Sequence, residues 1–137
     1  MPGVEHRTEL VFLALILSQT AHSVEERVTR LYEVFAPARF VSGLFGADHA
    51  TGFIILNAAL VLFGFWCWAV PVRGRWRSAR SLIWFWAILE LANGTSHSLL
   101  ALANGGYFPG VATAPLLLVF GAWLALRLTR VPARAAE

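Results

Sequence analysis

The chain has 137 residues, of which 58% are hydrophobic and only 14% are charged. Soluble domains carry about one quarter charged residues, so this composition excludes an ordinary water-soluble domain and indicates lipid as the solvent. All eleven basic residues are arginine and the formal net charge is +3, which in a membrane protein reports topology and does not indicate nucleic-acid binding. A single cysteine excludes an internal disulfide and a cysteine-based metal site.

Four apolar segments are long enough to cross a bilayer as helices, because about 20 apolar residues span its hydrocarbon core. We expect these helices at residues 9–27, 49–70, 81–103 and 110–127. Residues 28–47 form an outer connection, which either continues the first helix or forms a short amphipathic helix at the interface. The sequence therefore predicts an all-α fold, an integral membrane four-helix bundle that comprises residues 1–137 as a single transmembrane domain.

Short arginine-rich loops stay on the cytoplasmic side of bacterial membranes. The densest positive charge lies between the second and third segments, at Arg73, Arg75, Arg77 and Arg80. If this loop is inside, both termini are inside too, which agrees with Arg7 near the start and with the arginines near the end, Arg127, Arg130 and Arg134. We therefore expect a multi-pass protein of the bacterial cytoplasmic (inner) membrane with both termini cytoplasmic.

Polar side chains interrupt three of the four apolar segments. Such groups are costly in lipid and usually face a bundle interior or a cavity. Residues three and four apart share a helix face, and with the expected topology the polar groups of these three segments lie in the outer half of the membrane. The residues that we expect to meet there are His22, Glu25, Glu26, His49, Glu90, Asn93 and His97.

Less specific roles compete with this interpretation. Glu25 and Glu26 could mark the water-exposed end of the first helix, and His49 could be an interfacial cap. Asn93 could serve only to hold two helices together. Glu90 is harder to explain in this way, since a carboxylate deep in an apolar helix must be neutralised, protonated or paired.

Residues 22–26, His-Ser-Val-Glu-Glu, form the literal pattern H-x-x-E-E. Two later polar segments, Asn93-Gly-Thr-Ser-His97 and Tyr107-Phe-Pro-Gly-Val-Ala-Thr113, follow it. With these segments and four predicted spans, the chain resembles the HXXEE-domain family of small bacterial membrane proteins over about residues 10–126. The resemblance strengthens the choice of polar residues and implies no particular chemistry.

Imidazole and carboxylate groups together suit a divalent ion such as Zn, Fe or Mn. As metal ligands we expect His22, Glu26, His49 and His97. As catalytic residues we expect Glu25, Glu26, Glu90 and Asn93, with Glu26 or Glu25 as the general base. The leading hypothesis is a membrane-embedded enzyme, a metal-dependent hydrolase or oxidoreductase, that acts on a lipid-like or isoprenoid-like substrate and needs no other cofactor.

The sequence leaves two alternatives open. The same carboxylates and histidines could act without metal as acid and base, as in an isomerase or cyclase. They could instead bind or transport an ion, a proton or a lipid, and four short helices would then need to form a homo-oligomer. The expected partners are the lipid bilayer and a hydrophobic small molecule, and no nucleic acid.

Overall fold

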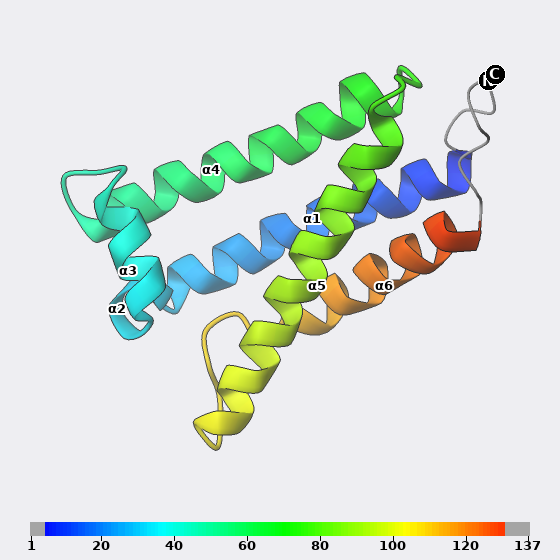
Figure 1. Ribbon diagram of the computed structural model, residues 1–137. Helices are drawn as coiled ribbons and strands as arrows, with labels where there is room; N and C mark the ends of the chain where they lie inside the picture. Colours follow the sequence, from blue (N-terminus) through cyan, green and yellow to red (C-terminus); the bar gives the residue numbers. More distant parts are fainter. Residues whose placement is uncertain (1–4, 131–137) are drawn as a thin grey trace.

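The structure is a computed structural model that describes residues 5–130. These residues form helices and no strand, which confirms the predicted all-α class. The four long helices are α1 (His6–Val28), α4 (His49–Cys67), α5 (Ala79–Ala103) and α6 (Ala114–Arg130), shown in Figure 1. The short elements are α2 (Leu31–Val34), α3 (Ala36–Gly43) and a π-helical turn, η1 (Trp68–Val72).

The connection between α1 and α4 consists of the two short helices α2 and α3, so α1 does not continue through it. Arg30 adopts a left-handed conformation, with φ of 55°, and this turns the chain away from the axis of α1. Helix α3 then packs closely against α4. A Cβ atom added at Gly52 would lie 1.8 Å from the carbonyl oxygen of Ser42, so this contact requires glycine.

Local chemistry sets both ends of α4. The Asp48 carboxylate accepts a hydrogen bond from the Thr51 backbone N–H at 2.9 Å, which caps the first turn. The hydrogen bonds from Thr51 also lower the pKa of Asp48. At the other end, Pro71 has no N–H to donate, and the helix widens into the π-helical turn η1 before it stops.

The long helices pack in the order α4, α1, α6 and α5, and α4 contacts α5 over only a short stretch. Figure 1 shows that α4 and α5 diverge from their connection and that α5 crosses in front of α1. The start of α1, the end of α6 and the α4–α5 connection lie at one end of the bundle, where Arg73 pairs with Glu9 at 3.4 Å. The opposite end carries α2, α3 and the loop between α5 and α6.

Two apolar clusters fill the bundle. The larger one includes Phe12, Leu15, Ile16, Ile83, Trp86 and Leu124. The smaller one, near the opposite end, comprises Leu31, Tyr32, Phe53 and Phe108. Between these two clusters, α1 buries polar side chains over the segment from Ser18 to Glu26. The polar site therefore has hydrophobic packing on both sides along α1.

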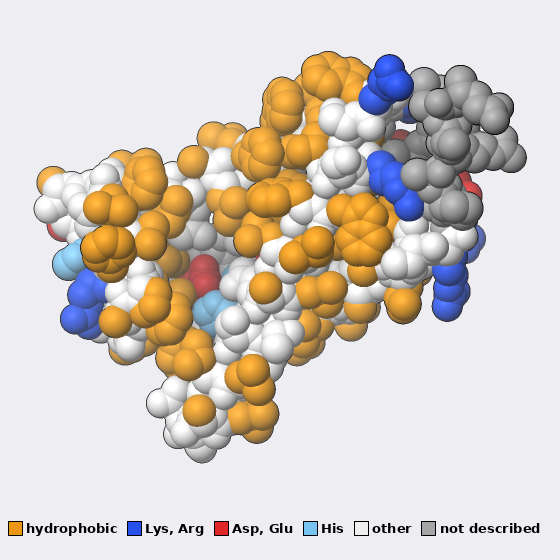
Figure 2. All heavy atoms as spheres, in the orientation of Figure 1, with side chains coloured by type: hydrophobic (Ala, Val, Ile, Leu, Met, Phe, Trp, Pro, Cys, Tyr) orange, Lys and Arg blue, Asp and Glu red, His pale blue; other side chains and the backbone are white. Residues whose placement is uncertain are grey.

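Large apolar side chains also cover much of the outer surface (Figure 2). Among residues 5–130, one stretch is long and apolar enough to cross a membrane, namely His49–Val72, which comprises α4 and η1. The most apolar 18 residues of this stretch have a mean hydropathy of 2.2, and 17% of them are buried inside the bundle. By length and composition the other three long helices do not qualify, so the predicted four-span topology is not confirmed and stays a prediction.

Candidate metal centre

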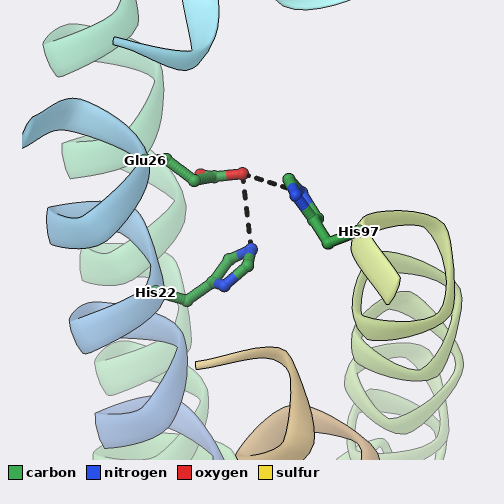
Figure 3. Close-up of side chains that lie close together, drawn as sticks. All are labelled: His22, Glu26 and His97. Carbon is green, nitrogen blue, oxygen red and sulfur yellow. Dashed lines mark ion pairs between the residues drawn. The ribbon is translucent and has the colours of Figure 1, made fainter. Parts of the chain in front are cut away.

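Three side chains predicted as metal ligands meet inside the bundle (Figure 3). His22 and Glu26 project from α1 one helical turn apart, and His97 projects toward them from α5. Glu26 Oε1 lies 3.3 Å from His22 Nε2 and 3.0 Å from His97 Nε2. The exposed fractions are 0% for His22, 5% for His97 and 6% for Glu26, so the group is shielded from solvent.

The proton on the His97 ring is fixed by the loop between α5 and α6. His97 Nδ1 lies 2.5 Å from the carbonyl oxygen of Pro109. A carbonyl oxygen can only accept a hydrogen bond, so Nδ1 must carry the hydrogen. In the neutral ring, Nε2 then holds a lone pair, and this lone pair is directed at Glu26.

The same loop fixes the proton on the His22 ring through a longer route. The Glu25 carboxylate accepts hydrogen bonds from the Tyr107 hydroxyl at 2.5 Å, from the backbone N–H groups of Ala112 and Thr113, and from the Thr113 hydroxyl at 2.6 Å. The Thr113 hydroxyl has one hydrogen, which it donates to Glu25. Its oxygen therefore accepts from His22 Nδ1 at 2.7 Å, and His22 Nε2 is left with a lone pair.

Two imidazole lone pairs and one carboxylate oxygen thus point at the same small volume. A single proton can join His97 to Glu26, but it leaves His22 Nε2, which is buried and has no hydrogen-bond partner. A buried polar atom without a partner costs about 1–3 kcal/mol. The three ligand atoms lie within 4.8 Å of one another, so this group could hold a metal ion, which would give His22 Nε2 a partner.

The backbone of the α5–α6 loop packs directly on the two imidazole rings. Gly110 has a φ of 90°, in the region that favours glycine. A Cβ atom added there would lie 2.6 Å from His97 Nδ1 and 2.7 Å from His22 Cε1. Farther out on the loop, partial burial and the hydrogen bond to Glu25 raise the pKa of Tyr107. The loop supplies the hydrogen-bond partner of each ring's Nδ1 atom.

Glu90 lies deeper in the bundle, on α5, and is fully buried. The nearest atom of the Gln19 amide lies 2.8 and 3.2 Å from the two carboxyl oxygens of Glu90. Asn93 donates a hydrogen bond to Glu90 at 3.3 Å. If Glu90 is charged, the Gln19 nitrogen faces it. If Glu90 is protonated, the Gln19 oxygen accepts the hydrogen of Glu90. The Gln19 nitrogen then donates to Ser23, and the Ser23 hydroxyl donates to Asn57 on α4.

The structure does not bring the other predicted ligand, His49, into the cluster. His49 is exposed at the start of α4 and lines a separate surface hollow with Tyr32 and Arg39. Of the predicted catalytic residues, Glu26 belongs to the cluster, Glu25 holds the α5–α6 loop, and Glu90 and Asn93 lie one layer deeper. Sequence reasoning did not assign roles to Pro109, Gly110 and Thr113. All three belong to the loop segment that contributed to the resemblance.

Over residues 8–124 the chain matches a family described as proteins of unknown function with an HXXEE motif. The chain belongs to the HXXEE family. No curated protein and no solved structure matches it. The structure gives each fixed position of the HXXEE motif a place at one site: His22 and the second glutamate, Glu26, face the candidate metal position, and the first glutamate, Glu25, binds the loop.

Proposed function

We propose that this HXXEE protein is a membrane-embedded metalloenzyme in which His22, Glu26 and His97 bind one divalent ion of Zn, Fe or Mn. The observation that supports the proposal best is the orientation of the two imidazoles. Each ring has its Nδ1 atom engaged by a partner outside the cluster and its Nε2 atom directed at Glu26, so that a neutral ring would present a lone pair there. Hydrogen-bonded partners of this kind orient the histidine ligands of known metal sites.

The ligand set also favours a catalytic site over a structural one. Structural zinc sites are closed by four protein ligands, whereas catalytic sites use three and keep a position for water or substrate. Two histidines and one carboxylate are also the ligand set of non-haem iron oxygenases. A metal ion held in this way can polarise a carbonyl or phosphoryl oxygen, or lower the pKa of a bound water.

A lipid-like substrate fits the surroundings of the site. Acidic and histidine atoms are visible at the bottom of a recess between α4 and α5, and hydrophobic side chains surround this recess (Figure 2). Large apolar side chains are exposed on every long helix, among them Leu17, Leu62, Leu99 and Val119. A protein surface of this kind is suited to lipid. We propose that all four long helices lie in the membrane and that an apolar molecule enters between α4 and α5.

Metal analysis of the purified protein tests the proposal. After the protein is loaded with Zn²⁺ and free metal is removed, we expect about one ion per chain in wild type. His22→Ala, Glu26→Ala and His97→Ala should each lose most of it, because three ligands are the minimum of a catalytic site. His49→Ala is the matched control and should keep the full content. Metal-free wild type, or equal loss in His49→Ala, would contradict the proposal.

A second experiment tests whether the protein is an enzyme that acts on a lipid. Vesicles made from a bacterial lipid extract are incubated with wild type, with His97→Ala and with chelated wild type, and the lipids are compared by mass spectrometry. We expect a lipid species that changes with wild type alone. A change that survives chelation would instead favour metal-free acid and base chemistry, for which the buried Glu90 is the specific observation. In that case Glu90→Gln should abolish the change.

A further inference from the structure

Glu25 and Glu26 are adjacent in the HXXEE motif, yet they face different partners. Glu26 faces the two histidines, whereas Glu25 receives four hydrogen bonds from the α5–α6 loop. We infer that Glu25 is a positioning residue that fixes the tautomer of His22 through the Thr113 hydroxyl, and so keeps His22 Nε2 free to bind metal. The inference deepens the proposed function and rests on it for its effect on metal affinity.

The directions of the hydrogen bonds around Thr113 determine the tautomer of His22. A carboxylate that accepts four hydrogen bonds is an acceptor only, so the hydrogen of Thr113 must point at Glu25. The Thr113 oxygen then has lone pairs alone to offer His22, and the contact of 2.7 Å requires a hydrogen on Nδ1. The negative charge of Glu25 thus sets the ring's proton through one intervening hydroxyl.

Without this relay, His22 would adopt the opposite tautomer. Its Nε2 atom lies 3.3 Å from Glu26, a carboxylate that attracts a hydrogen. If Thr113 does not accept a hydrogen bond from Nδ1, the ring's single proton moves to Nε2 and forms a hydrogen bond to Glu26. The lone pair then lies on Nδ1, directed at the loop and away from the metal position, so metal binding must first reverse the tautomer.

Two substitutions break the relay in different ways. In Glu25→Leu, no carboxylate accepts the Thr113 hydrogen, which then turns to His22 Nδ1. In Thr113→Val, the hydroxyl is absent, and only the interaction of His22 with Glu26 determines the tautomer. Both variants should therefore shift the His22 proton from Nδ1 to Nε2. Tyr107→Phe is the matched control, because it removes a loop hydrogen bond to Glu25 and leaves the Thr113 bond in place.

The experiment is ¹⁵N NMR of histidine-labelled, metal-free protein in detergent micelles, with the His22 signals assigned by their loss in His22→Gln. We expect a protonated Nδ1 in wild type, Tyr107→Phe and Thr113→Ser, and a protonated Nε2 in Glu25→Leu and Thr113→Val. The Zn²⁺ dissociation constant should rise about 10–100-fold in the last two variants, which is the usual effect of losing an outer partner of a ligand.

The relay is wrong if wild-type His22 carries its proton on Nε2, or if Glu25→Leu and Thr113→Val both keep it on Nδ1. It is also wrong if Tyr107→Phe shifts the proton as strongly as Glu25→Leu does, because loop attachment alone would then explain the effect. Since the tautomer is read without metal, a wild type with the expected tautomer and no Zn²⁺ affinity would overturn the proposed function and leave the relay intact.

Discussion

At the scale of single residues, Gly110 is the position where the loop backbone comes closest to both imidazoles. We expect Gly110→Ala to destabilise the protein by about 1–3 kcal/mol, because the new methyl group overlaps both rings and the backbone conformation disfavours alanine. Zn²⁺ affinity should fall as well, since the rings must move apart. Thermal unfolding in detergent and calorimetric Zn²⁺ titration measure the two effects.

Gly105→Ala is the control for this prediction. Gly105 has a φ of 66°, so alanine is strained there too, but an added Cβ would meet no atom within 4 Å. The variant should lose some stability and keep the Zn²⁺ affinity of wild type. Equal Zn²⁺ affinities in Gly110→Ala and wild type would show that the loop does not constrain the ring positions.

The sequence predicted three residues of the candidate site, His22, Glu26 and His97, because helical spacing and depth limit which polar groups can meet. It named Glu26 as a ligand but left the general base open between Glu25 and Glu26, since both lie at the end of one helix and only the fold of a distant loop shows that Glu25 binds that loop. The hydrogen bonds that the Pro109 carbonyl and the Thr113 hydroxyl accept from the two histidines could not be predicted either, because the place of the loop depends on the fold and residues of every type have a carbonyl.

At the scale of helices, the contact between α3 and α4 depends on one glycine. We expect Gly52→Ala to lower stability by about 3 kcal/mol, because the added methyl group would meet the backbone oxygen of Ser42, which cannot move without displacing α3. Thermal unfolding measures the loss. Gly43→Ala lies in the same hairpin and meets only ordinary contacts with His49, so it should be neutral. Similar melting temperatures for the two variants would contradict this packing.

The four apolar runs of the sequence, each bounded by glycine, proline or charge, overlap the four long helices. The connection at residues 28–47 was ambiguous, because its spaced apolar residues fit either a continued α1 or a separate helix. The left-handed conformation of Arg30 ends α1 and makes the connection a separate element. Arginine does not favour this conformation, so the sequence does not predict it.

At the scale of the whole molecule, the arrangement of helix ends predicts a topology. The start of α1, the end of α6 and the arginine-rich α4–α5 connection share one end, and the α5–α6 loop lies at the other. In a Cys67→Ser background, Arg77→Cys and Gly106→Cys should be labelled by a membrane-impermeant maleimide from opposite sides of the membrane. Arg77 is expected on the cytoplasmic side. Labelling of both from one side would contradict four spans.

X-ray absorption at the zinc edge of the loaded protein shows whether His22, Glu26 and His97 bind one metal ion. We expect two imidazole nitrogens at about 2.0–2.1 Å together with oxygen ligands, and the loss of one imidazole contribution in His97→Ala. A spectrum without imidazole scattering, or one that is the same in wild type and His97→Ala, would contradict this expectation.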